Sequence, residues 1–178
     1  MESTQSPSRR RGAATLEMIL VLPVLLLVTI GLIEFGVMFA NLQQVALASR
    51  VGAERASELA TLPAFSTGDP VPLKVIEAIE QQLQSSCIDW CHIRLEHNTA
   101  DPLIQEVLES TQGEPCGCED FVPLPADEIP TGRYVRLTLT VPLSEVVPSG
   151  LTLFGCNLFS AEQAFHSTTI FRCEIGTP

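Results

Sequence analysis

The six cysteines are the side chains best able to do chemistry in this chain, and all of them follow residue 86. An even number of cysteines beyond an apolar N-terminal segment is typical of an oxidised, extracytoplasmic domain stapled by disulfides. A Cys87–Cys91 pair would close a local loop, and a Cys156–Cys173 pair would join the last two expected strands. The sequence alone does not choose among the pairings of the six candidates, which are Cys87, Cys91, Cys116, Cys118, Cys156 and Cys173.

The remaining thiols, Cys116 and Cys118, allow two interpretations. In the first they pair with each other or exchange with the Cys87–Cys91 pair. In the second they join Cys87, Cys91 and His92 as ligands of a zinc ion, since thiolates and imidazole are the ligands that zinc prefers. The CxxxC and CxC spacings differ from the paired CxxC spacing of common zinc sites. We therefore favour disulfides and expect no bound metal and no other cofactor.

No catalytic motif accompanies these thiols. The sequence contains no GxSxG, no HExxH, no phosphate-binding glycine loop and no CxxC redox pair. His92, His97 and His166 are scattered along the chain. Cys91 precedes His92 directly, but sequence neighbours on a strand point to opposite faces and do not form a nucleophile–base pair. We expect a protein without catalytic activity.

Two carboxylates lie at or within a long apolar run. Residues 18–40 form 23 consecutive positions at which Glu34 is the only charged side chain, and Glu17 directly precedes them. As a helix this run would extend about 34 Å, at roughly 1.5 Å per residue. That length covers a hydrocarbon core of roughly 30 Å, which predicts a transmembrane helix. Ionisable residues in such a segment are candidate functional residues, although Glu34 is near enough to the distal interface to reach water.

Three further residues of the apolar run affect how it can pack. Pro23 removes one backbone hydrogen bond and predicts a bend or local loosening of the helix. Gly31 and Gly36 would allow another helix to approach closely. An equally acceptable interpretation is that both glycines are ordinary residues of a lipid-facing helix.

The basic residues around the run favour one orientation. Arg9, Arg10 and Arg11 precede it, whereas Arg50 and Arg55 follow it at a greater distance. The positive-inside rule therefore places the N-terminus in the cytoplasm. A secretory signal peptide cut after residue 48, to leave Ser49 as the first residue, is disfavoured because the apolar run is too long.

The elements that follow the run predict a long helix joined to a small α+β head. Residues 41–60 continue the helix as a stalk, whose narrow face of mostly small residues suits close packing against another helix or the sheet of its own domain. That face comprises Leu42, Val45, Ala46, Ser49, Ala53, Ala56 and Ala60.

The head is expected to carry helices and an antiparallel sheet. A proline-rich loop at 61–72 precedes a helix at 73–87, whose apolar stripe would be Leu73, Ile76, Ile79 and Leu83. Alternation of apolar and polar residues predicts strands at 91–97 and 133–142, and a last strand within 160–174 that pairs with the strand before it. Residues 102–110 are expected to form a short helix, and residues 113–132 a long surface loop.

Residues 1–60 and residues 61–178 differ in net charge. Residues 1–60 hold five arginines and five glutamates, so the whole net charge of −11 falls in residues 61–178. A nucleic-acid-binding protein needs a basic footprint, so no nucleic-acid partner is expected. The acidity of the head keeps a small domain soluble.

The order of features at the N-terminus resembles TadE-like proteins, which are pseudopilins of the tight-adherence (Flp) branch of the type IV pilus and type II secretion machinery. The similarity extends over about residues 9–56 and includes a basic leader ending at Gly12, then Ala13, and Glu17 as the fifth residue of a chain that starts at Ala13. The family's "LP" and "iEFG" motifs correspond to residues 22–23 and 33–36, and a weaker similarity covers residues 132–143.

This resemblance implies a processing step and an assembly step. A prepilin peptidase would cut between Gly12 and Ala13 and free an α-amino group with a pKa of roughly 7.7–8.0. Glu17 would pair with the free N-terminus of a neighbouring subunit, since such a pair is strengthened among packed helices. Expected partners are the membrane, the prepilin peptidase, and other pseudopilins or pilus assembly proteins.

The resulting organisation has four parts: a basic cytoplasmic leader (1–12), a transmembrane helix (13–40), a helical stalk (41–60) and an extracytoplasmic head (61–178). The protein would be a structural component of a pilus or related secretion system, held in the bacterial inner membrane or incorporated in a pilus. The alternative is a membrane-anchored binding module or small enzyme unrelated to pili.

Overall fold

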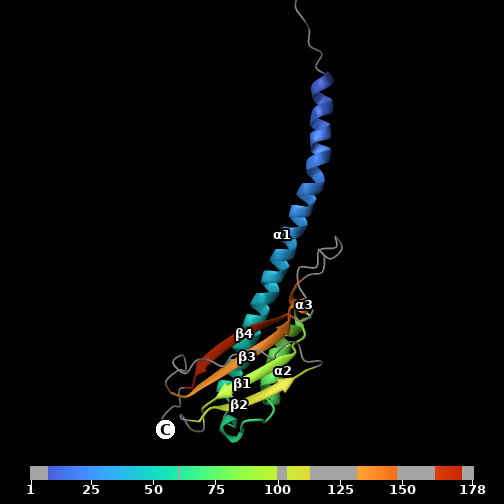
Figure 1. Cartoon of the computed structure of the whole chain (residues 1–178). Helices are drawn as coiled ribbons and strands as arrows, with labels where there is room; N and C mark the ends of the chain where they lie inside the picture. The colour runs from blue at the N-terminus through green and yellow to red at the C-terminus, as the bar shows by residue number, and fades with distance from the viewer. Residues whose placement is uncertain (1–7, 60, 100–103, 113–131, 148–162, 174–178) are drawn as a thin grey trace, which may run out of the picture.

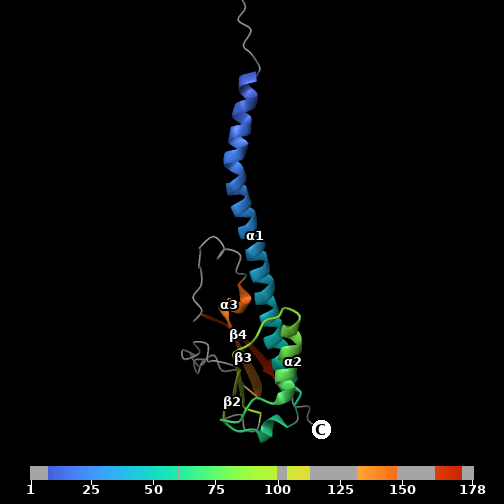
Figure 2. The ribbon, with the colours of Figure 1, turned by 90° about the vertical axis from the view of Figure 1, so that its right-hand side faces the viewer.

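One long helix leads into a small α+β head. The computed structural model describes residues 8–59, 61–99, 104–112, 132–147 and 163–173, with side chains from Thr15 onward. In the head, the C-terminal part of α1 packs against β3 and β4 of a four-stranded antiparallel sheet, and α2 packs beside α1 with its buried residues in the same core (Figure 1). The view turned by 90° shows the two helices together on one side of the strands (Figure 2). The predicted α+β architecture is thereby confirmed.

Helix α1, Ser8–Ser57, is continuous over 50 residues and contains Pro23. The segments predicted as a transmembrane helix and a stalk are therefore one helix of about 75 Å. The first half projects away from the head, and the second half lies against it (Figure 1). Partly buried Met38 and Leu42 mark where the packing against the core begins.

Small residues let the second half of α1 lie close to the sheet. Its buried residues are Val45, Ala48, Ser49, Gly52, Ala53 and Ala56. The predicted small face is confirmed at four of these positions, but Ala46 is exposed. The face is rotated from the predicted one because α1 must contact α2 on one flank and β4 on the other, which brings Ala48 and Gly52 inward. Ala60 lies outside the described residues.

Helix α2, Leu73–Gln84, packs beside α1. Its buried residues are Val75, Ile79 and Leu83, whereas Leu73 is 68% exposed. The prediction that Leu73 belongs to the buried stripe was therefore wrong. Leu73 is the first residue of the helix, directly after Pro72, and the helix enters with Val75 turned toward the core.

The sheet has the strand order β2-β1-β3-β4, with every neighbouring pair antiparallel. Its strands are β1 (His92–His97), β2 (Glu106–Thr111), β3 (Tyr134–Pro142) and β4 (Ala164–Arg172). The strands expected at 91–97, 133–142 and within 160–174 are confirmed, as is the pairing of the last two. A 3-10 turn, Leu62–Ala64, and a short helix α3, Leu143–Val146, were not predicted.

The helix expected at 102–110 is replaced by strand β2. Leu108 is fully buried, and β2 pairs with the whole of β1. An isolated helix of nine residues has little stability of its own, because nucleation is costly. Pairing with β1 and burial of Leu108 outweigh that weak local preference. The surface loop expected at 113–132 falls almost wholly outside the described residues.

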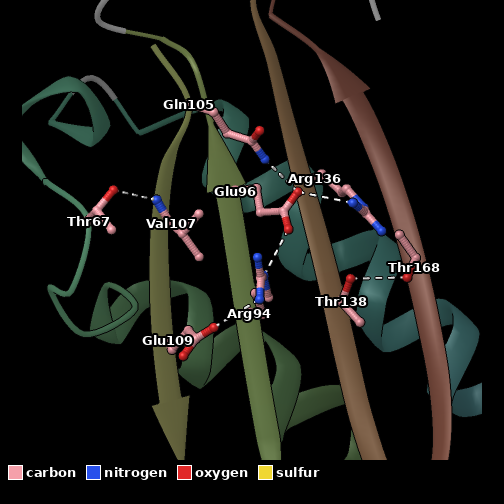
Figure 3. Close-up of polar contacts among 9 residues, drawn as sticks. All are labelled: Thr67, Arg94, Glu96, Gln105, Val107, Glu109, Arg136, Thr138 and Thr168. Carbon is pink, nitrogen blue, oxygen red and sulfur yellow. Dashed lines mark hydrogen bonds and ion pairs between the residues drawn. The ribbon is translucent and has the colours of Figure 1, made fainter. Parts of the chain in front are cut away.

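The sheet face turned away from the helices is polar and carries an ion-pair network (Figure 3). The Glu96 carboxylate accepts hydrogen bonds from Arg94 Nε at 2.8 Å, from Arg136 at 3.1 Å and from Gln105 Nε2 at 2.9 Å. Glu109 lies 3.2 Å from Arg94. Because the Glu96 side chain is 2% exposed, the arginines supply the compensation that a buried carboxylate requires.

Candidate functional site

The thiols do not form the expected local pairs. Cys87 and Cys173 are free, so neither a Cys87–Cys91 nor a Cys156–Cys173 disulfide exists in the structure. Cys87 has a φ of 52° and an exposed side chain just after α2, whereas Cys91 is buried where β1 begins, with its sulfur 3.3 Å from the Thr140 carbonyl oxygen. Cys91 is not a free thiol. Cys116, Cys118 and Cys156 lie outside the described residues.

The histidines do not gather around a thiol or a carboxylate cluster. His97 is buried on the helix-facing side of the sheet, and this burial lowers its pKa. His92 and His166 lie on the polar face, where burial is the main cause that lowers the His92 pKa. Among the residues that the structure describes, no group of three or more histidines, cysteines or acids could hold a metal. The zinc alternative needs Cys116 and Cys118, which are not described.

The exposed half of α1 is the feature that most needs a functional explanation. Between residues 16 and 39 its large apolar side chains are 44–71% exposed, except for the partly buried Ile30 and Met38. The helix has a mean hydropathy of 2.7 over its most apolar window, and in the described part of the chain it alone is long and apolar enough to cross a membrane. Such a surface is far larger than a soluble monomer exposes, so it requires lipid or other helices around it. The chain therefore has the single N-terminal apolar helix that is typical of a single-pass membrane protein.

The residues predicted for processing, assembly and helix packing all lie on this half of α1. Gly12 and Ala13 belong to its first turns, although their surroundings are not described. Glu17 is exposed at the start of the apolar surface. A Cβ added to Gly31 or to Gly36 would meet nothing within 4 Å, so both glycines leave open space on the surface.

Glu34 and Pro23 differ from these residues in their surroundings. Pro23 lies within the helix without ending it. Glu34 is partly exposed, and its Oε1 is buried without a hydrogen-bond partner among the described residues. It lies one turn before Met38, where the packing of the head begins. The roles of Gly12, Ala13, Glu17 and these two residues remain predictions.

The junction between exposed helix and head was missed by the sequence analysis. The Asn41 side-chain amide donates to the Val146 carbonyl oxygen at 2.8 Å, which ties α1 to the end of α3. Asn41 is the first polar residue after the apolar run, and this was the available signal. The partner could not be foreseen, because Val146 is 105 residues away.

Comparison with known proteins supports the N-terminal resemblance. The family model described as TadE-like protein matches residues 12–54. No curated protein and no solved structure matches the chain. The match contains the entire exposed apolar half of α1 and most of its packed half, and it leaves out the remainder of the head. Residues 12–54 of this chain are thus TadE-like, as the sequence predicted, and this relates the protein to a structural, pilus-associated family.

Proposed function

We propose that this protein is a TadE-like pseudopilin, a structural or assembly component of a tight-adherence (Flp) pilus or a related secretion system. The observation that carries this proposal is the coincidence of two features. The TadE-like match begins at Gly12, and the segment that it covers contains the apolar half of α1 that nothing in the described head buries. A helix of this kind acts by packing among lipids and other helices, not by catalysis.

Processing by a prepilin peptidase between Gly12 and Ala13 would produce the mature chain. The protein would then cross the bacterial inner membrane once, with its N-terminus in the cytoplasm and the head outside. The three arginines before Gly12 support this orientation. Among the described cysteines, Cys91 is not a free thiol, which suits the oxidising environment outside the cytoplasm, whereas Cys87 and Cys173 are free.

In the mature chain Glu17 would receive the free N-terminus of a neighbouring subunit. Its position supports this role, because Glu17 is exposed at the proximal end of the apolar surface. A carboxylate and an ammonium group attract each other more strongly among packed apolar helices than in water. Leaving either charge unpaired there would be costly, so the pair would fix the register between subunits.

Mass spectrometry of the N-terminus, on protein recovered from cells that contain the peptidase, tests the proposal. We expect a chain starting at Ala13, with 166 of the 178 residues. Gly12→Leu should leave the leader attached, whereas Gly36→Leu, at a position with open space around it, should be cut normally. A wild-type chain that keeps Met1 would refute processing, and a chain starting at Ser49 would favour a signal peptide.

A further inference from the structure

The two edges of the sheet differ in whether their outward backbone groups are hydrogen-bonded. The outer edge of β2 is closed by the chain itself, through the segment at residues 67–71. Gly68 N donates to Val107 O at 3.0 Å, and Glu109 N donates to Asp69 O at 3.3 Å. Val107 N also donates to the Thr67 hydroxyl, as Figure 3 shows. An edge covered in this way cannot pair with another chain.

The outer edge of β4 is open in the part of the chain that is described. Leu143 N donates to Gln163 O at 2.8 Å, and Cys173 N donates to Arg133 O at 3.0 Å. Odd-numbered residues of β4 therefore bond to β3, and by alternation the even-numbered residues direct their backbone groups outward. No described residue hydrogen-bonds to the outward groups. These groups belong to Ala164, His166, Thr168, Ile170 and Arg172.

We propose that the β4 edge accepts an extended, acidic segment of another protein chain as a fifth strand of the sheet. The nine residues of β4 are long enough for several main-chain hydrogen bonds. Open edges are protected in many proteins by charged side chains or proline. Strand β4 has neither between Ala164 and Phe171. Strand addition uses main-chain hydrogen bonds for affinity and the neighbouring side chains for selectivity.

The charged side chains described around this edge are Arg172 on β4 and Arg50 and Glu54 on α1, so the edge carries a small excess of positive charge that favours an acidic partner. Arg172 is exposed at the end of β4, and His166, counted as neutral, is exposed earlier on the strand. On α1, Ser49 lies against β4, with its hydroxyl 2.9 Å from those of Ser167 and Thr169. Arg50 is the next residue, about 100° further around the helix and exposed, and Glu54, one turn later, is exposed on the same flank.

Helix α2 lies on the opposite flank of α1, so Arg50 is on the flank beyond β4. On the flank of α1 that faces α2, Gln44 hydrogen-bonds to Gln82 of α2. Seen down the axis of α1, Gln44 lies about 140° from Ser49, in the direction away from Arg50. A strand added beside β4 would therefore pass near Arg50. Arg50 and Arg172 outnumber Glu54 at this edge, in a chain whose net charge is −11, so they favour an acidic segment here.

Antiparallel pairing with strand β4 of a second copy of this chain does not fit the edge. Antiparallel pairing of β4 with β4 of another copy would place a two-fold axis roughly perpendicular to the sheet. Helix α1 runs along one direction in both perpendicular views and lies roughly in the plane of the sheet (Figures 1 and 2). The two-fold rotation would reverse that direction. The two apolar halves would then point to opposite sides and could not enter one bilayer in the same orientation.

Amide hydrogen exchange of the full-length protein tests the proposal. It is measured on protein purified in detergent and on membranes from cells that contain the other pilus-assembly proteins. We expect the outward amides of His166, Thr168 and Ile170 to exchange about tenfold or more slowly in those membranes than in detergent. Ile170→Pro removes an outward donor without touching the bonds to β3, and should abolish the protection. The matched control Ile170→Val should retain it.

Other results would overturn the proposal. Equal exchange in both samples would show that no strand is added, and slow exchange in detergent would show that the chain covers its own edge. Protection in membranes that contain this protein without the other assembly proteins would show pairing between copies. If Ile170→Pro failed to fold, Arg50→Glu on the exposed helix surface should still weaken the protection. A processed N-terminus without edge protection would refute this inference alone, whereas edge protection with Met1 retained would refute only the processing.

Discussion

The two halves of α1 are parts of one continuous helix, but they have opposite surroundings. Before Met38 the apolar side chains are large and occur all around the helix, and most of them are about half exposed or more. From Val45 to Ala56 the buried residues are small and confined to one side, while Glu54 and Arg55 are exposed. A helix that is apolar all around belongs in lipid, whereas one with a single apolar stripe belongs on the surface of a domain.

Both halves are helical, so helix formation does not explain why their environments differ. The size of the side chains and their distribution around the helix determine which half lies in lipid and which half packs in the head. The same kind of residue has different consequences in the two halves. Glycine is tolerated at Gly36 with open space around it, but Gly52 lies where an added Cβ would be 2.7 Å from Ile79 Cγ1. Substitutions matched between the halves therefore separate membrane effects from effects on the head.

The largest effect is expected from a charge placed in the exposed half. Leu26→Arg lies near the middle of the apolar run, where insertion of a charged side chain costs roughly 2.5–3.5 kcal/mol. We expect a reduced share of the protein in the membrane fraction after cell fractionation, with Leu26→Ile as a control that behaves like wild type. The head should unfold at the same temperature, because Leu26 does not contact it. Unchanged membrane recovery would contradict a transmembrane role for this half.

A smaller effect, on the head alone, is expected from Gly52→Ala. The new methyl group would also lie 3.1 Å from Leu137 Cδ1, so α2 or the sheet must shift. Overpacking of this kind costs typically about 1–3 kcal/mol. Unfolding can be followed by the fluorescence of Trp90, the single tryptophan, which is buried in the head. Gly36→Ala is the matched control in the other half and should leave the head's stability unchanged. Equal stability of the two variants would show that the contact at Gly52 is loose.

A hydroxyl group gives a finer test of the same contrast. Ser49 Oγ lies 2.9 Å from both Ser167 Oγ and Thr169 Oγ1, where α1 crosses β4. Ser49→Ala leaves both hydroxyls with one partner fewer and should destabilise the head by about 1 kcal/mol. Thr29, in the exposed half, bonds only to its own helix at Leu25 O, so Thr29→Ala should not affect the head. An undiminished unfolding temperature for Ser49→Ala would mean that water replaces the lost contacts.

Strongly periodic segments were predictable from the sequence, and elements that depend on distant partners were not. Strand β3 alternates over nine residues, and its position was predicted within one residue. Strand β2 was mistaken for a helix, because six residues carry too weak a pattern and pairing with β1 decides their structure. The contacts of Asn41 with α3 and of Glu96 with Arg136 join residues far apart in sequence.

The TadE-like resemblance could be predicted from the sequence because its signal is local, whereas the roles of the individual site residues stay predictions. Gly12, Glu17 and Pro23 lie within a segment whose order of residues is specific, and the TadE-like match covers the same segment. The Cys156–Cys173 pair was predicted from the expected pairing of the last two strands, and the Cys87–Cys91 pair was predicted from proximity in sequence. That reasoning failed at Cys87, since the turn after α2 directs it to solvent while Cys91 is buried.

The stability of the head should also depend on pH, through a residue that the exposed half lacks. His97 is buried between Glu106 and Val135 in the sheet, and its Nδ1 lies 3.1 Å from the Thr99 hydroxyl. Burial is the main cause that lowers the His97 pKa below 6.5, while the Glu106 carboxylate opposes it. The half-buried His92 has a pKa lowered in the same direction.

The unfolded chain binds protons at His97 and His92 more readily than the folded chain does. The part of the folding free energy that depends on these histidines being neutral is therefore complete above about pH 6.5, and it decreases as the pH drops toward the pKa values of the folded state. We expect the unfolding free energy, measured by Trp90 fluorescence, to decrease between about pH 7 and pH 5. His97→Gln keeps a polar side chain without a titrating group in this range, so its stability should change less with pH, with His92 responsible for the remainder. A slope equal to that of the wild type would show that His97 is hydrated in the folded head, and that the packed part of the protein is looser around β1 than its burial indicates.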